Sequence, residues 1–354
     1  MSEQIFTELR EFMHSLAGGF PPSDTGVEIK LLKKMFTAEE AELTMKLKEV
    51  PESVSDIAGR IGVDEAELAK QLEDMALKGI IFRVREGDER LYRAYHFLVG
   101  LYEFQLPHLD KEFAELFEEY LPYFGMGMAE VKSGQMRTIP LGSAVDAEGG
   151  VATYNNVREL IKDKQFISVQ DCICRKEQAL LGNECDYPKE ICIGFDDFAR
   201  FYVDNGMGRQ IDMDETLKLL EKAEEAGLVL MPTNSQDVEA ICCCCSCCCP
   251  NLRFAKMMER PIDMVRTHYL SKIDPDLCTA CEECIDRCPM DAIKLDDSVS
   301  KIIDGRCIGC GVCIPTCADE AITLELIPGM EVPPADFEAT FQQIRDERGL
   351  TKIQ

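Results

Sequence analysis

The sequence lacks the motifs by which many enzymes are recognised. It has no Walker loop, no complete GxGxxG after a strand and no serine or cysteine nucleophile motif, so intrinsic nucleotide, flavin or nicotinamide binding is unsupported. Its four histidines match no local zinc or haem motif and are far apart in the sequence: His14, His96, His108 and His268. We therefore expect the histidines to be core or surface residues.

Signals for export and membrane insertion are also missing. The N-terminal stretch MSEQIFTELREF opens with acidic and polar residues instead of a basic segment followed by an apolar one. No uninterrupted apolar run approaches the roughly 18 residues of a membrane span. These absences predict a cytoplasmic protein without a membrane span, in a reducing compartment where disulfides are rare.

Cysteine and negative charge are both present in excess. The 354 residues include 19 cysteines and carry a formal net charge of -27, and the chain is long enough for two or three domains. Because disulfides need an oxidising compartment, these thiols are expected to bind soft metal. The negative charge should repel nucleic acid and anionic membranes and favour protein partners with basic docking faces.

Two cysteine motifs near the C-terminus repeat at an interval of 29 residues. CTACEECIDRCP has the spacing C-x2-C-x2-C-x3-C-P, and CIGCGVCIPTCA repeats it with Ala318 in place of the proline. In such motifs three cysteines bind one cubane and the fourth reaches the other, whereas a zinc site would leave cysteines unused. The spacing predicts two 4Fe-4S clusters, one held by Cys278, Cys281, Cys284 and Cys317 and the other by Cys307, Cys310, Cys313 and Cys288.

On these motifs, residues 271–326 resemble the bacterial two-cluster ferredoxin. The resemblance implies the two-cluster ferredoxin fold and transfer of single electrons. In the repeat, Ile293 and Ile322 occupy equivalent places, so we expect them in matched strands that cover the clusters.

The other eleven cysteines lie in residues 151–270, predicted to be a mostly helical cysteine-rich iron-sulfur domain. Neighbouring side chains of an extended run point to opposite sides, so ICCCCSCCCP must face two sites or leave some thiols unligated. We expect one or two further 4Fe-4S clusters, with Cys172, Cys174, Cys185 and Cys192 contributing to one. The expected ligands within the run are Cys242, Cys244, Cys245, Cys247, Cys248 and Cys249. The alternative is a patch of reactive thiols, which would oxidise easily in an aerobic cell.

Arg175 follows the CxC pair directly. It is a candidate to neutralise cluster charge or to donate hydrogen bonds to sulfide. A surface salt bridge is the competing interpretation.

The first 125 residues contain no cysteine and several helix-capping pairs. Thr37 with Glu40, Ser53 with Asp56 and Asp64 with Glu67 each predict a helix start. IIFRVR, the turn EGDER and LYRAYHF then predict two strands, so residues 24–97 resemble a winged helix. Its candidate recognition helix, DEAELAKQLEDMALK, carries five acids against two lysines and would repel phosphate. We therefore expect a protein-docking module or scaffold rather than a DNA reader.

The predicted fold class is α+β with several domains. The expected boundaries are a winged-helix-like docking domain at 1–125, a linker at 126–150, the cysteine-rich domain at 151–270, the two-cluster ferredoxin domain at 271–326 and a tail at 327–354. Asp212 with Glu215 predicts one helix of the cysteine-rich domain, and residues 335–346 predict a helix in the tail.

The whole order, from residue 25 to 324, is similar to a group of multi-cluster 4Fe-4S proteins of anaerobic bacteria and archaea. Relatives in that group often have asparagine at the position of Cys243, which is therefore left out of the expected ligands. The resemblance implies an electron-transfer protein or subunit between redox partners of an oxidoreductase complex. Two alternatives remain open: a redox sensor acting through the winged helix, and an oxidoreductase that binds substrate at an unusual cluster of the middle domain.

Overall fold

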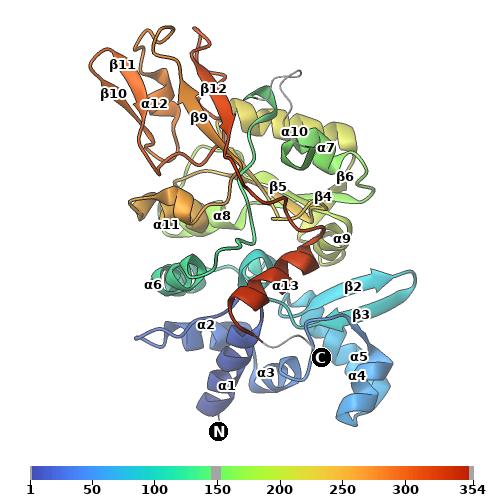
Figure 1. Cartoon of the computed structure of the whole chain (residues 1–354). Coiled ribbons are helices and arrows are strands. Elements are labelled where there is room, and N and C mark those ends of the chain that lie inside the picture. The colour runs from blue at the N-terminus through green and yellow to red at the C-terminus, as the bar shows by residue number, and fades with distance from the viewer. Residues whose placement is uncertain (1, 145–152, 351–354) are drawn as a thin grey trace.

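The fold was analysed in a computed structural model that describes residues 2–144 and 153–350. Residues 145–150 of the predicted linker, the first two residues of the predicted middle domain and the last four of the tail lie outside the described residues. The N-terminal helices occupy one end of the molecule, the C-terminal strands β9 to β12 the other, and a sheet built from β4 to β8 lies between them (Figure 1). No helix in the described part of the chain is long and apolar enough to cross a membrane.

The N-terminal part consists mainly of short helices packed around one aromatic core. Its elements are α1 Ser2–Ser15, α2 Val27–Met35, α3 Ala38–Thr44, β1 Glu52–Ser53, α4 Val54–Ile61, α5 Glu65–Leu77, β2 Phe82–Glu86, β3 Glu89–Arg93 and α6 Lys111–Ala129. The predicted helix starts are confirmed, because the side chains of Thr37, Ser53 and Asp64 each accept a hydrogen bond from a backbone N–H in the first turn.

Strands β2 and β3 form the predicted hairpin with a shorter loop than expected. Strand β2 ends at Glu86 and strand β3 begins at Glu89, so only two residues lie between them. Strand β1 pairs with the other side of β3. The order of α3, β1, α4, α5, β2 and β3 along the chain is helix, strand, helix, helix, strand, strand.

The middle domain is built on a five-stranded antiparallel sheet with the order β6-β4-β5-β8-β7. Its elements are α7 Val157–Ile161, β4 Ile167–Asp171, α8 Ile173–Leu180, β5 Glu190–Phe195, α9 Asp196–Asp204, β6 Gly208–Ile211, α10 Met213–Glu225, β7 Val229–Pro232, β8 Ala240–Cys244 and α11 Pro250–Met257. The prediction of a mostly helical domain missed this sheet, whose strands β4, β5 and β7 are short and mostly buried on both faces instead of half-exposed. The helix capped by Asp212 is confirmed as α10.

The C-terminal domain has two strand pairs and one short helix. Its elements are β9 Tyr269–Ile273, α12 Glu283–Arg287, β10 Ile293–Asp296, β11 Val299–Ile302 and β12 Ile322–Leu326. Ile293 pairs with Ile302 in one ladder and Ile322 with Ile273 in the other, and all four belong to one apolar cluster with Cys284 and Cys313. The equivalent places expected for Ile293 and Ile322 are thus confirmed.

The segment predicted as a linker packs against the middle sheet and the C-terminal domain. Its first residues finish helix α6, and Ile139 is fully buried and bridges to Leu230 of β7. Further along, the Leu141 N–H donates to the carbonyl of Cys310 at 3.1 Å. This segment therefore joins the middle sheet to the C-terminal domain.

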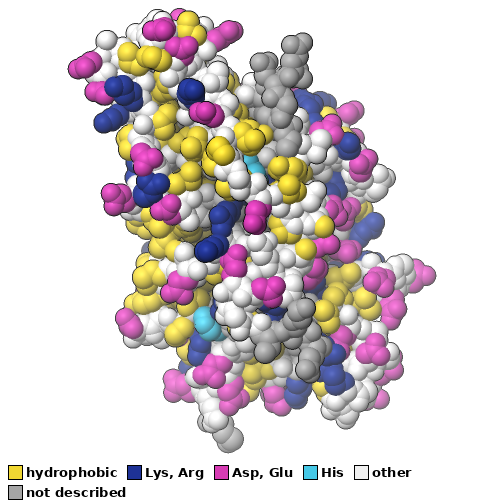
Figure 2. Space-filling model, in the orientation of Figure 1, with side chains coloured by type: hydrophobic (Ala, Val, Ile, Leu, Met, Phe, Trp, Pro, Cys, Tyr) yellow, Lys and Arg dark blue, Asp and Glu magenta, His cyan; other side chains and the backbone are white. Residues whose placement is uncertain are grey.

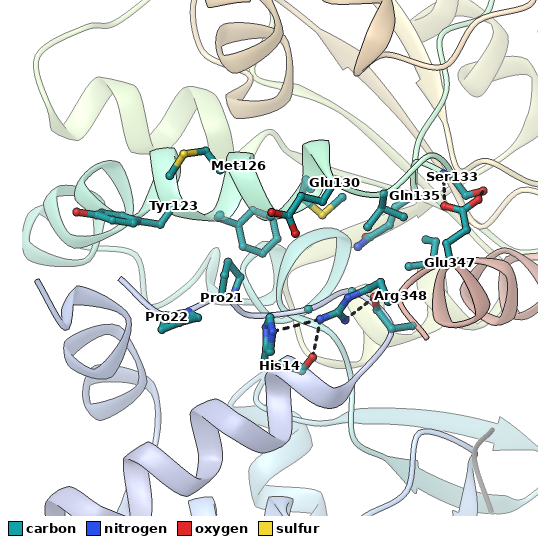
Figure 3. A pocket seen from close by; sticks show the side chains of 18 residues that line it. His14, Pro21, Pro22, Tyr123, Met126, Glu130, Ser133, Gln135, Glu347 and Arg348 are labelled. Carbon is teal, nitrogen blue, oxygen red and sulfur yellow. Dashed lines mark hydrogen bonds between the residues drawn. The ribbon is translucent and has the colours of Figure 1, made fainter. Parts of the chain in front are cut away.

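The tail returns to the N-terminal end of the molecule through helix α13 Phe337–Glu347, close to the predicted helix. Arg348 donates to the carbonyls of His14 and Leu16 at 2.9 and 2.6 Å, and the Ser133 N–H and hydroxyl donate to Glu347 (Figure 3). These contacts border a cavity of about 600 Å³ between α1, α6 and α13. None of the described residues that line this cavity is a cysteine.

Candidate metal centres

The structure brings Cys288 together with the second cysteine motif. Cys288, Cys307, Cys310 and Cys313 line one small cavity in the C-terminal domain. The last three are buried, whereas Cys288 is half-buried at the end of α12. This is the set of four thiols that the crossed-over spacing predicts for one cubane.

The first motif lies nearer to solvent. Cys281 is exposed and Cys278 is half-buried, while Cys284 is buried in the apolar cluster that Cys317 also contacts. The short helix α12 separates Cys284 from Cys288 and directs them to different sites. Of the four thiols predicted for the other cubane, Cys281 is therefore the one that is exposed to solvent.

Backbone donors reach the sulfurs in a pattern that follows the 29-residue repeat. Ala292 N–H donates to Cys288 Sγ and Ala321 N–H to Cys317 Sγ, both at 3.3 Å. Ser300 N–H donates to Cys278 Sγ and Ser271 N–H donates to Cys307 Sγ, both at 3.4 Å. N–H donors stabilise the charged thiolate form, so the peptide frame suits thiolates that carry iron.

Residues 270–318 match the family model of the 4Fe-4S dicluster domain. The C-terminal domain is thus similar to 4Fe-4S dicluster domains. Neither a curated protein nor a solved structure matches the chain. The dicluster domain and the clustered cysteines support 4Fe-4S clusters as the cofactor and electron transfer as the general role. These clusters are bound by thiolates, and the buried cysteines of the domain fit that demand.

The Ser271 hydroxyl lies 3.6 Å from Cys313 Sγ, which predicts a small effect on reduction potential. Replacing Ser271 with alanine should lower the potential of that cluster by on the order of 40 mV or less, because a hydrogen bond contributes about 1 kcal/mol and sulfur is a weak acceptor. Spectroelectrochemical titration measures the shift. Thr316→Ala is the control, since the Thr316 hydroxyl donates to a carbonyl instead of a sulfur. An equal shift in both variants would contradict the assignment.

Nine cysteines of the middle domain line a second cavity of about 80 Å³, together with apolar side chains. Six of the nine, which exclude Cys243, Cys245 and Cys248, are called the inner cysteine group: Cys172, Cys174, Cys192, Cys242, Cys244 and Cys249. Hydrogen bonding with Cys174 lowers the pKa of Cys172, and hydrogen bonding with Cys192 lowers the pKa of Cys242. The sheet produces the grouping, because β4 and β5 place Gln170 opposite Cys192, whose Sγ accepts a bond from the Gln170 amide at 3.5 Å.

Four cysteines form a tighter group, of which Cys245 and Cys248 also line the second cavity. The sulfurs of Cys185, Cys245, Cys247 and Cys248 all lie within 4.8 Å of one another. The expectation that Cys185 joins Cys172, Cys174 and Cys192 is therefore not met by this geometry, because the loop before β5 carries Cys185 to the far end of the cysteine run. We call these four residues the outer cysteine group.

Cys243 also borders the second cavity but is counted in neither group. On β8 it alternates with Cys242 and Cys244 and packs into the apolar core instead, where burial raises the pKa of its thiol. This placement agrees with its omission from the expected ligands.

Arg175 is 2% exposed, so the surface salt bridge left open by the sequence is wrong. Its guanidinium donates to the carbonyls of Pro188 and Cys243 at 2.8 and 2.9 Å. It interacts electrostatically with Cys172 of the inner group and Cys245 of the outer group. Arg175 is thus the positive charge between the two groups of thiols.

Two carboxyl groups near these thiols, half-buried Glu103 and fully buried Glu177, were not singled out from the sequence. Glu103 lines the inner cavity, accepts the Gly100 N–H at 2.7 Å, and has its pKa raised to about 8 by burial. Burial and the neighbouring Glu118 raise the pKa of Glu177 to about 8 as well. Sequence patterns gave no signal for either residue, because their burial depends on contacts between α8, α6 and the loop after β3.

Glu177 predicts a pH dependence of stability. When folding raises the pKa of a carboxyl group, the free energy of unfolding of the protein falls as pH increases from the usual pKa to the folded value, here about 8. The slope is at most about 1.4 kcal/mol per pH unit. Glu177→Gln cannot ionise and should show a flatter fall of the thermal midpoint between pH 5 and 8, measured without oxygen. Exposed Glu184→Gln is the control and should keep the wild-type slope. Parallel curves for wild type and Glu177→Gln would refute the assignment.

Proposed function

We propose that this protein relays single electrons between redox partners of anaerobic metabolism, through the dicluster domain and at least one further cluster in the middle domain. The observation that carries the proposal is the position of the two dicluster sites. One motif has its Cys281 exposed, and the other has Cys307 and Cys310 buried in the core of the middle domain. Electrons would enter or leave at the exposed site and pass inward through the buried one.

A short chain of packed residues between the buried dicluster site and the middle domain supports inward electron transfer. Leu141 donates its N–H to the carbonyl of Cys310, and Ile139 bridges to Leu230 of β7. Leu230 pairs with Cys243 of β8, between the two inner-group residues of that strand. The buried dicluster site is therefore connected to the cysteine run through a few residues in direct contact.

A second contact holds the two domains together. Arg287, at the end of α12, donates to the carbonyls of Glu224 and Glu225 at 3.2 and 2.8 Å. These carbonyls lie at the C-terminus of α10, where the helix carries partial negative charge and a cation is favourable. The contact supports a fixed distance between the dicluster domain and the middle domain.

The N-terminal part would serve as the docking module. Its helix and strand order agrees with a winged helix, but Glu65, Glu67 and Asp74 on α5 are exposed. Acidic side chains are spread over the visible face of the molecule from one end to the other (Figure 2). This charge favours a basic protein partner over DNA.

The proposal is tested by electron transfer in the absence of oxygen. Reduced methyl viologen should reduce the protein, and cytochrome c, a basic acceptor, should reoxidise it, so that catalytic amounts of the protein accelerate the overall reaction. Because the formal net charge is -27, the rate should fall steeply as salt is added. Clusters that are not reduced and reoxidised reversibly would refute the proposal.

The control is a variant that lacks the exposed dicluster site. Cys281→Ala changes a residue on the surface, so packing is preserved. The relay rate should fall severalfold, whereas exposed Thr279→Ala in the same loop should retain it. A rate unchanged by Cys281→Ala would remove the exposed site from the path.

A further inference from the structure

We infer that the outer cysteine group, Cys185, Cys245, Cys247 and Cys248, binds a single tetrahedrally coordinated metal ion, zinc or iron, instead of a 4Fe-4S cubane. The inference concerns a site outside the dicluster match, because that match covers residues 270–318. It stands independently of the proposed electron relay.

The sulfur separations fit one ion. In a tetrahedral site with metal-sulfur bonds of about 2.3 Å, the sulfurs are about 3.8 Å apart. Cys248 Sγ lies 3.5 Å from Cys185 Sγ and 3.8 Å from Cys247 Sγ, and the four sulfurs all lie within 4.8 Å of one another. Four thiolates of a cubane bind four different iron atoms, which holds them farther apart than four ligands of one ion.

The dicluster domain provides an internal comparison. Among the described residues, the outer group is the one set of three or more cysteine, histidine or acidic residues whose ligand atoms approach one another this closely. Among the eight cysteines of the dicluster motifs, which are predicted to bind cubanes, and among those of the inner group, no three sulfurs lie this close to one another. The structure thus separates two kinds of thiol site by distance.

The four cysteines of the outer group come from two loops that lie next to each other, as the ligands of many structural metal sites do. Cys185 comes from the loop between α8 and β5, and the other three ligands come from the turn between β8 and α11. The Cys249 N–H donates to the carbonyl of Cys245 at 3.1 Å and shapes that turn. One ion would tie the two loops together across 63 residues of sequence, counted between Cys185 and Cys248.

The ligand set selects the kind of metal. Four thiolates in a tetrahedron are typical of zinc and of iron, while calcium and magnesium prefer oxygen ligands. Each thiol loses its proton on binding, and the buried guanidinium of Arg175 beside Cys245 offsets part of the resulting negative charge. The same chemistry serves both metals, so the measurement must distinguish them.

The test begins with the full-length wild type purified without oxygen. Zinc, iron and acid-labile sulfide are quantified per chain, and X-ray absorption is recorded at the zinc edge. Zinc at about one atom per chain with four sulfur neighbours at about 2.3 Å supports a zinc site. Iron in excess of sulfide by about one atom supports an iron site, because cubanes contain equal numbers of both. Equal iron and sulfide with no zinc would overturn the inference.

A variant then assigns the ion to these cysteines. Cys247→Ala changes the exposed member of the group, so it disturbs little packing, and Cys243→Ala in the same run is the matched control. Cys247→Ala should lose the single zinc, or the excess iron, with no loss of sulfide, while Cys243→Ala keeps both. Loss of iron and sulfide together from Cys247→Ala would instead show a cubane, and an unchanged metal content would show that the site is elsewhere. The retained electron paramagnetic resonance signals of the dicluster domain report that the variants are folded.

Discussion

Replacing Cys288 with alanine should remove the cluster of Cys307, Cys310 and Cys313, although Cys288 follows the other motif in the sequence. Cys288 lines the cavity of that second set, and its Sγ accepts the Ala292 N–H at 3.3 Å. With one of four thiolates missing, the cubane should be lost or converted to a three-iron form. Iron should fall by as much as about four atoms per chain, with sulfide falling in parallel when the whole cubane is lost.

Double variants show which cluster was lost. Cys288→Ala combined with Cys307→Ala should cost no more iron and sulfide than one variant alone, because both residues hold the same cubane. Cys288→Ala combined with Cys278→Ala should cost twice as much, because two cubanes are then affected. Iron and sulfide quantification and electron paramagnetic resonance on oxygen-free protein measure both cases. Additive loss in the first pair would mean that the ligand sets do not cross over.

The features that the sequence predicted well are local. The capping pair of Thr37 with Glu40 forms within one helical turn, and the dicluster motif confines three ligands to seven residues. Such patterns need no knowledge of distant contacts. They located helices α3, α4, α5 and α10 and the dicluster domain.

The features that the sequence did not predict depend on long-range pairing. The middle sheet places β5 between β4 and β8, so the position of Cys192 relative to Cys242 is set by strands far apart in the chain. Cys185 lies close to Cys172 in sequence but lies against Cys248 in space. Residue spacing alone does not specify which of eleven thiols share a site.

Removing the guanidinium of Arg175 should destabilise the middle domain and cost it metal. Arg175→Ala would leave the carbonyls of Pro188 and Cys243 without their donor and the nearby thiolates without their cation. Breaking a buried charge interaction of this kind costs about 3–5 kcal/mol. We expect a lower thermal midpoint and a loss of metal from the inner and outer cysteine groups.

Conservative and surface variants separate charge from geometry. Arg175→Lys keeps the positive charge but cannot span two carbonyls as a planar guanidinium does, so it should fall between wild type and alanine. Arg209→Ala removes two exposed ion pairs, with Glu190 and Glu215, from β6 of the same domain, which should cost about 1 kcal/mol or less. Metal content and thermal midpoint are compared in all three, with the dicluster signals as a check on folding. If Arg175→Ala retained full metal and the wild-type midpoint, the guanidinium would have no part in holding the two groups of thiolates, and another charge would have to offset them.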